Sequence, residues 1–213
     1  MTFPPGQDTH GKYPDVYRYS EEHDLPEEKR RQFLETMEGQ IGKLDFLMES
    51  LIKMSRLETG TFVLKPEEAQ LSDTIARALS LVWARAEKKG IRLDADCDSR
   101  ITVRHDPKWT AEAIGNILDN AVKYTPEGGS ISVQVRPWQI YTRIDITDTG
   151  MGIDPEHYHD IFQRFYRAQE AAGEEGVGLG LYLAQEIVRQ EMGYITVKSE
   201  KGKGSTFSVF LLS

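Results

Sequence analysis

The chain has a single cysteine, and this scarcity excludes two kinds of scaffold. Cys97 is the one thiol among 213 residues, so neither an internal disulfide nor a cysteine metal cluster can form within the chain. No apolar run approaches the roughly 20 residues that a membrane span needs, and the amino-terminal stretch lacks the basic and then apolar layout of a signal peptide. The sequence therefore predicts a cytoplasmic chain that makes no membrane contact.

Positive charge is also in short supply. Lys and Arg number 26 against 34 Asp and Glu, which gives a formal net charge of -8. Such a surface does not attract nucleic acid, and we expect no nucleic-acid partner. An anionic ligand remains compatible with this balance, because backbone amides and local cations can hold phosphate in an acidic protein.

Three segments follow one another along the chain. Residues 1–26 are rich in proline and glycine, which predicts a loose leader holding at most part of a helix and a turn. Residues 27–58 contain no proline and form one long predicted helix, within a segment that we extend to 27–60. Its apolar residues are spaced 4, 3, 4 and 3 apart, at Met37, Ile41, Leu44, Met48 and Leu51. This spacing is typical of a helix that packs against another helix.

Residues 61–213 alternate between strand and helix patterns. We expect strands at 61–65, 91–97, 101–106, 129–137, 139–148, 194–200 and 205–212, and helices at 72–90, 107–124, 157–166 and 178–192. Ser72 or Asp73 is the expected cap of the first helix, and Asp106 with Pro107 opens the second. The predicted fold class is α+β, a two-layer sandwich with a mixed, largely antiparallel sheet and helices on one face, preceded by the long helix.

The first candidate motif lies on the predicted helix 107–124. Asn116 and Asn120 are four residues apart and share a face, which Lys123 and Tyr124 extend. An amide oxygen is a hard ligand that suits Mg²⁺, and lysine suits phosphate. The alternative is a surface helix with two solvated amides.

The second motif is "DTGMGID", which follows a predicted strand. Asp148 ends the strand, and Gly150 and Gly152 open the backbone beside it, so another molecule can approach closely. A carboxylate there can accept a hydrogen bond from an exocyclic amine such as that of adenine. A plain turn is the alternative.

Two further motifs follow. In "IFQRFYR", aromatic anchors hold Arg164 and Arg167 near a loop of small and polar residues. In "GVGLGL", Gly176, Gly178 and Gly180 lead into a helix whose free amides can bind phosphate. The glycines do not form a P-loop, because no Gly-Lys-Ser/Thr follows, and the preceding loop excludes the dinucleotide fingerprint.

Together, "NILDNAVKYTP", "DTGMGI", "IFQRFYR" and "GVGLGL" resemble the N, G1, F and G2 boxes of the sensor histidine kinases. Order and spacing agree from about Arg56 to Ser213, and "MSRLETG" resembles the junction between that family's dimerisation helix and its ATP-binding domain. The resemblance implies that 27–60 is the second dimerisation helix and 61–213 a Bergerat-type ATP-binding catalytic domain. The wider superfamily includes gyrase-type and Hsp90-type ATPases.

The resemblance also implies roles, with ATP and Mg²⁺ as the cofactors. Asn120 would ligate Mg²⁺, Asp148 would bind the adenine amine, and residues 168–177 would form a lid. The catalytic residues would be Asn116, Lys123 and Arg167. The nucleotide-contacting residues would be Asn116, Asn120, Lys123, Tyr124, Asp148, Gly150, Gly152, Ile153, Phe165, Arg167, Gly176, Val177, Gly178, Leu179 and Gly180.

The sequence departs from the family pattern in three places. Asn116 stands where gyrase-type relatives have a glutamate that activates water, so hydrolysis should be slow and transfer to a protein side chain is favoured. Val177 replaces a frequent threonine. His10 and His23 are not at the distance and in the context of the phosphoacceptor, so we expect that the acceptor histidine lies outside this chain.

The resemblance therefore implies the ATP-binding catalytic portion of a two-component sensor histidine kinase. Its partners would be a second copy, through the 27–58 helix of a complete helical hairpin, and a response regulator whose aspartate receives the phosphate. The complete protein would be membrane-anchored. Two alternatives remain: a nucleotide-binding dimerisation switch without transferase activity, and a serine-directed kinase of the same superfamily. The long apolar helix argues against the serine-directed kinase.

Overall fold

The structure is a computed structural model that describes residues 26–61, 63–167 and 177–213. The chain divides into two compact units, residues 1–46 and residues 47–213. Helix α1 (Glu27–Glu58) continues from the first unit into the second. Its five seam residues from Met37 to Leu51 are all exposed. None of the helices formed by the described residues has the length and apolar character that a membrane crossing requires.

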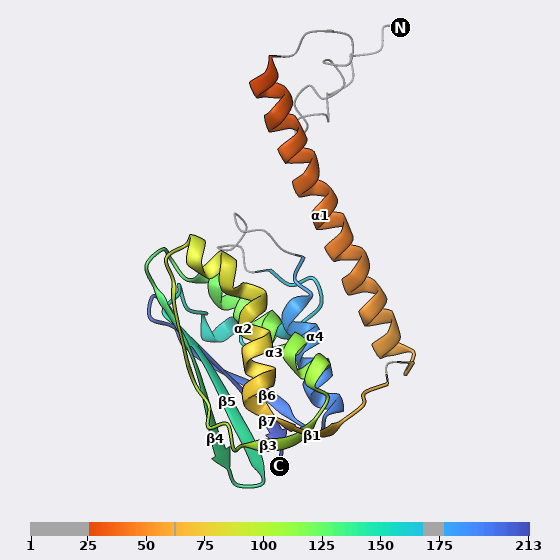
Figure 1. The fold of residues 1–213 in the computed structure, drawn as a ribbon, viewed down its shortest axis with the longest axis vertical. Helices are drawn as coiled ribbons and strands as arrows, with labels where there is room; N and C mark the ends of the chain where they lie inside the picture. The colour runs from red at the N-terminus through yellow and green to blue at the C-terminus, as the bar shows by residue number, and fades with distance from the viewer. Residues whose placement is uncertain (1–25, 62, 168–176) are drawn as a thin grey trace, which may run out of the picture. The chain divides into compact units, whose positions relative to one another are not determined.

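The second unit contains two sheets and the remaining helices (Figure 1). Its elements are β1 (Glu67–Gln70), α2 (Leu71–Lys88), β2 (Arg92–Asp96), β3 (Thr102–His105), α3 (Pro107–Tyr124), β4 (Ser130–Trp138), β5 (Tyr141–Asp148), the 3-10 turns η1 (Pro155–His157) and η2 (Asp160–Phe162), α4 (Gly180–Gln190), β6 (Tyr194–Glu200) and β7 (Gly204–Leu212). The larger sheet has the order β2-β4-β5-β7-β6, and β1 pairs with β3 separately.

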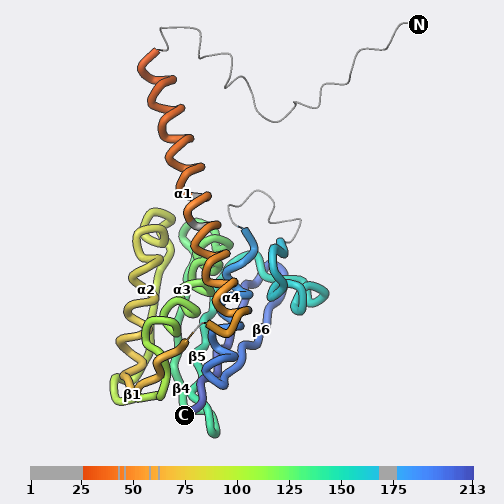
Figure 2. Tube along the Cα trace, turned by 90° about the vertical axis from the view of Figure 1, so that its right-hand side faces the viewer, coloured from red at the N-terminus to blue at the C-terminus, as the bar shows by residue number. Residues whose placement is uncertain are grey.

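The larger sheet is mixed, as the sequence predicts. Strands β2 and β4 are parallel, and the three other pairings are antiparallel. Helices α2, α3 and α4 lie side by side against one face of the sheet (Figures 1 and 2). The core between them contains Ile114, Ile117 and Leu118 of α3, together with Ile144 and Ile146 of β5, and each is fully buried.

Helix α3 begins where its sequence predicts. The Asp106 carboxylate accepts hydrogen bonds from the amides of Lys108 and Trp109 at 3.1 and 3.2 Å, and Pro107 occupies the first turn. The carboxylate also accepts from the Lys65 amide at 2.8 Å. The Asp106 side chain therefore holds the segment around Lys65, which precedes β1, against the start of α3.

Three predicted local features are wrong. Residues 61 and 63–66 form no strand, and β1 starts at Glu67, because the ladder partner β3 faces 67–70 instead. Neither Ser72 nor Asp73 caps α2, which begins at Leu71 without a side-chain cap. The helix expected at 157–166 is instead the two 3-10 turns η1 and η2.

Candidate nucleotide site

Helix α3 carries the four residues of the first motif. Asn116, Asn120, Lys123 and Tyr124 are all half-buried. The Asn116 Nδ2 atom is buried, and it has no hydrogen-bond partner among the described residues. A buried amide donor without a partner is costly, and such an atom indicates a ligand or water at this position. The Lys123 ammonium lies 4.8 Å from the centre of the Tyr124 ring.

The start of α4 faces Asn116. A Cβ atom added at Gly180 would lie 3.5 Å from Asn116 Oδ1. Leu179, which precedes the helix, is buried and provides no side-chain cap. Going along α4 from its start, the first amide with an acceptor among the described residues is that of Leu183, which donates to the Leu179 carbonyl oxygen. Among the described residues, the amides of 180–182 have no acceptor, so this helix end can bind an anion through free N–H groups and the helix dipole.

Asp148 lies at the end of β5, with only 6% of its surface exposed. Its Oδ1 accepts from the Gly150 amide at 2.8 Å and from the Ser205 amide at 3.3 Å. Among the described residues, no donor reaches Oδ2. Burial raises the pKa of the Asp148 carboxyl above its ordinary value, and the two amides oppose this effect.

Gly150 joins Asp148 to the end of α3. A Cβ atom at Gly150 would lie 2.7 Å from both Asp148 Oδ1 and the Tyr124 carbonyl oxygen, so a larger residue does not fit without movement. The same carbonyl accepts from the Met151 amide at 3.3 Å. The "DTGMGI" segment is therefore in contact with the carboxyl end of α3.

The third and fourth motifs meet each other. The Phe165 amide donates to the Gly178 carbonyl oxygen at 2.8 Å. Gly178 has a φ of +75°, and a Cβ atom there would lie 2.5 Å from the Tyr166 carbonyl oxygen. Val177 is half-buried, while Phe165 and Arg167 are exposed. Gly176 and most of the predicted lid lie outside the described residues.

Two residues that we predicted to contact the nucleotide, Gly152 and Ile153, contact the protein's own strand β6. Gly152 has a φ of +71°, and a Cβ atom there would lie 2.1 Å from the Glu200 carbonyl oxygen, so the protein's own backbone already requires this glycine. The Ile153 amide donates to Ser199 Oγ at 2.8 Å. Both residues contact the end of β6, and their roles toward a nucleotide stay predictions.

Sequence reasoning missed the residues from β7 that complete the Asp148 environment. Ser205 supplies an amide, and a Cβ atom at Gly204 would lie 2.0 Å from the Asp148 carbonyl oxygen. The available signal is "KGKGST", where a glycine directly precedes the predicted strand 205–212. Thr125 was also missed: its hydroxyl is buried at the end of α3 without a partner among the described residues.

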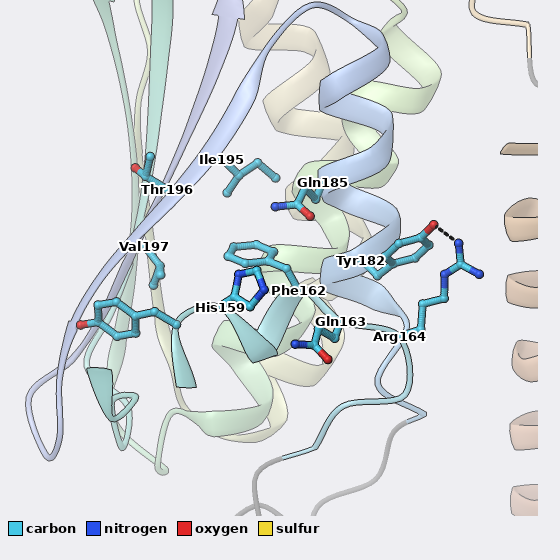
Figure 3. A pocket seen from close by; sticks show the side chains of 10 residues that line it. His159, Phe162, Gln163, Arg164, Tyr182, Gln185, Ile195, Thr196 and Val197 are labelled. Carbon is cyan, nitrogen blue, oxygen red and sulfur yellow. Dashed lines mark hydrogen bonds between the residues drawn. The ribbon is translucent and has the colours of Figure 1, made fainter. Parts of the chain in front are cut away.

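A separate pocket of about 770 Å³ lies beside α4 and the edge strand β6 (Figure 3). Its lining includes His159, Phe162, Gln163, Gln185 and Thr196. At its margin, the Arg164 guanidinium donates to the Tyr182 hydroxyl at 2.6 Å and lies over that ring. None of the predicted nucleotide-site residues lines this pocket.

The fold and the site define a class of protein. Residues 105–213 match the family described as histidine kinase-, DNA gyrase B-, and HSP90-like ATPase. This match covers just over half of the chain, and the chain belongs to this family.

Curated relatives narrow the comparison. The chain is 33% identical over 180 residues to the adaptive-response sensory kinase SasA of Synechococcus sp. (strain JA-2-3B'a(2-13)), covering 83% of this chain and 48% of SasA. It is 30% identical over 183 residues to the sensor-like histidine kinase SenX3 of Mycobacterium tuberculosis (strain ATCC 25618 / H37Rv), covering 85% of this chain and 45% of SenX3. The chain thus spans about half the length of these relatives.

Solved structures agree with the fold. The mycobacterial sensor histidine kinase MprB is 27% identical, with a TM-score of 0.60 over 70% of this chain and 97% of that chain. The Acinetobacter baumannii histidine kinase AdeS is 20% identical, with a TM-score of 0.75 over 93% of this chain and 89% of that chain, which supports the fold alone.

Proposed function

We propose that this chain is the ATP-binding catalytic portion of a two-component sensor histidine kinase. The γ-phosphoryl group of ATP would be transferred to a histidine outside this chain and then relayed to an aspartate of a response regulator. The observation that carries the proposal is the meeting of both glycine-rich segments on α3. Asn116 faces the uncapped start of α4, and Tyr124 contacts the loop beside Asp148.

The adenine would lie against Asp148 and Gly150. The exocyclic amine would donate to Oδ2, since Oδ1 already accepts two amides. Because Gly150 has no side chain and a Cβ atom there would press on Tyr124, it keeps the backbone close at this point. Burial of the carboxylate strengthens such a hydrogen bond by excluding competing water.

The phosphates would lie between α3 and the start of α4. The buried Asn116 Nδ2 donor and the amides of 180–182, which have no acceptor among the described residues, would supply neutral donors for phosphate oxygens. Lys123 and Arg167 would supply positive charge. This donor set fits a polyanion and explains how an acidic chain can hold one.

Asn120 would hold Mg²⁺ through its side-chain oxygen. Within residues 26–61, 63–167 and 177–213, no three His, Cys, Asp or Glu side chains gather as a metal site. A site with few protein ligands is consistent with Mg²⁺, which is usually bound by one or two side chains, waters and substrate phosphates. When bound, the ion would neutralise charge on the phosphates.

Phosphoryl transfer would then depend on positioning rather than on a protein base. Asn116 cannot accept a proton from water, which disfavours hydrolysis. An imidazole nitrogen of the acceptor would form a bond to the γ-phosphorus as the bond to the ADP oxygen breaks, and ADP would leave. Among solved structures of similar fold, histidine kinase ThkA forms a complex with the response regulator protein TrrA, and ShkA forms a complex with AMPPNP. The exposed seam of α1 supports a homodimer as the assembly that presents the acceptor.

The test supplies the missing acceptor. The chain is incubated with γ-labelled ATP, Mg²⁺ and a separate polypeptide that carries a helical hairpin with the acceptor histidine. We expect acid-labile, base-stable label on that histidine. Nucleotide binding without any labelling would favour the dimerisation switch, and acid-stable label on a serine would favour the serine-directed kinase.

A further inference from the structure

A half-buried carboxylate, that of Glu191, joins α3 to α4 at the ends of both helices that lie away from the candidate phosphate site. Glu191 follows the last residue of α4, and its Oε1 accepts from the Asp106 amide at 2.8 Å. The Thr110 hydroxyl lies 2.8 Å from both carboxylate oxygens, and Thr110 is fully buried. Three contacts therefore fix the carboxyl end of α4 to the amino end of α3.

The two helices are antiparallel neighbours, and they meet at two places along their length (Figures 1 and 2). Glu191 meets the first turn of α3, and Gly180, at the opposite end of α4, faces Asn116. Helix α4 has 11 residues, and at 1.5 Å per residue it is about 16 Å long. A tilt of about 5° at Glu191 would displace the start of α4 by about 1.4 Å over that length.

Apolar side chains also pack between these helices. Ile114 and Ile117 of α3 are buried with Leu183 and Ile187 of α4 in the core. Hydrophobic burial has no direction, so the hydrogen bonds to Glu191 add a directional contact to this packing. Within the part of the chain that the structure describes, no other side-chain hydrogen bond joins α3 to α4.

Asp106, the residue before α3 whose amide binds Glu191, is itself fixed by several hydrogen bonds. Asp106 accepts from the Lys65, Lys108 and Trp109 amides through its side chain. The preceding residue, His105, is fully buried, and its ring nitrogens contact Thr74 Oγ1 at 2.7 Å and the Val103 carbonyl oxygen at 2.8 Å. Glu191 therefore binds a rigid point of the domain.

We propose that Glu191 is a positioning residue that fixes α4 along α3, through Asp106 and Thr110, and thereby holds the start of α4 beside Asn116 for the nucleotide phosphates. The proposal rests on the nucleotide site proposed above. It predicts an effect on phosphate binding that exceeds any effect on the base and ribose. A shift of about 1 Å at a site that holds reacting groups can reduce rates about 100-fold, so a small tilt is sufficient.

Burial raises the pKa of Glu191 to about 6, and the nearby Asp106 charge adds to this effect, while the hydrogen bonds from Asp106 and Thr110 oppose it. A charged acceptor here lowers the stability of the folded state at neutral pH. It also binds its donors more strongly than a neutral acceptor would.

The experiment compares two ligands on the full chain. Affinities for a nonhydrolysable ATP analogue with Mg²⁺ and for adenosine, which has the base and ribose without phosphate, are measured by calorimetry on wild type, Glu191→Ala and Glu191→Gln. Glu186→Ala is the matched control, because Glu186 lies on α4 but pairs with Arg189 of the same helix at 2.8 Å. Glutamine keeps both acceptor contacts at Oε1 and should restore the geometry.

We expect Glu191→Ala to weaken analogue binding at least about ten-fold while adenosine binding changes less than about two-fold. Glu191→Gln and Glu186→Ala should remain within about three-fold of wild type for both ligands. Equal weakening of both ligands, or no weakening, would overturn the positioning role. If Glu191→Ala does not fold, Thr110→Val is judged by the same criterion. Wild type that binds neither ligand would overturn the proposed function itself, and this inference with it.

Discussion

Replacement of Asp148 by asparagine should weaken nucleotide binding without lowering the stability of the fold. Asparagine has nearly the same shape, and its Oδ1 can still accept from the Gly150 and Ser205 amides, at 2.8 and 3.3 Å in the wild type. The change is confined to the Oδ2 atom, an acceptor, which is replaced by an NH₂ donor. That donor would face the exocyclic amine of adenine, which is also a donor.

The expected magnitude follows from that mismatch. A hydrogen bond to a charged acceptor contributes about 1.5–3 kcal/mol, and a buried donor left unpaired costs about 1–3 kcal/mol. The lower ends of these two ranges sum to about 2.5 kcal/mol, and at about 1.4 kcal/mol for each factor of ten Asp148→Asn should weaken nucleotide binding at least about 60-fold.

Stability should move in the other direction. Because burial raises the pKa of Asp148 in the folded state, that state binds the proton more tightly than the unfolded chain does. The carboxyl therefore lowers the stability of the fold increasingly as the pH rises through its raised pKa. Asparagine carries no charge, so at neutral pH the variant should unfold at the same temperature as wild type or at a higher one.

The assay combines calorimetric titration of a nonhydrolysable ATP analogue with thermal unfolding. Asp145→Asn is the matched control, because Asp145 lies on the opposite face of β5 and pairs with Arg143 at 2.7 Å. It should leave nucleotide affinity unchanged. Asp148→Asn with wild-type affinity would remove Asp148 from the adenine role, and equal losses of affinity and stability would show a general packing defect instead.

Three further outcomes are expected. Gly178→Ala should lower the unfolding temperature and weaken analogue binding, because the new Cβ atom would lie 2.5 Å from the Tyr166 carbonyl oxygen at a φ of +75°; calorimetry and thermal unfolding test this, and an unaffected variant would contradict it. Asn120→Ala should weaken analogue binding in Mg²⁺ but not in EDTA, and equal loss in both would argue against metal ligation. Glu191→Gln should gain about 2 kcal/mol of unfolding free energy relative to wild type as the pH rises from below 4.5 to above 6, since the folded-state pKa of about 6 exceeds the ordinary 4.5; urea denaturation across that range measures it, and a constant difference would refute it.

Local patterns predicted most of the elements that surround the site. Asp106 and Pro107 start α3 because a cap and a proline act on neighbouring residues in the chain. The alternation in 129–148 predicts β4 and β5, which pair through a short connection. The strand predicted at 61–65 was wrong, because a strand needs a neighbouring strand to pair with, and β3 pairs with residues 67–70.

The sequence predicted which residues form the candidate site, but it did not predict which residues of other helices and strands they contact. The spacing of Asn116 and Asn120 is a property of one helix, and it is visible in the sequence. The contact between Asn116 and Gly180 is not, because it requires α3 and α4 to pack side by side.

The sequence by itself determined most of the helices and strands in their order, the face on which the asparagines lie and the glycines that approach closely. Only the tertiary structure decided that Ser205 would donate to Asp148, 57 residues away, and that Glu191 would bind Asp106, 85 residues away. Periodicity and capping act over one or two turns of chain, whereas these contacts depend on how the sheet and helices pack together.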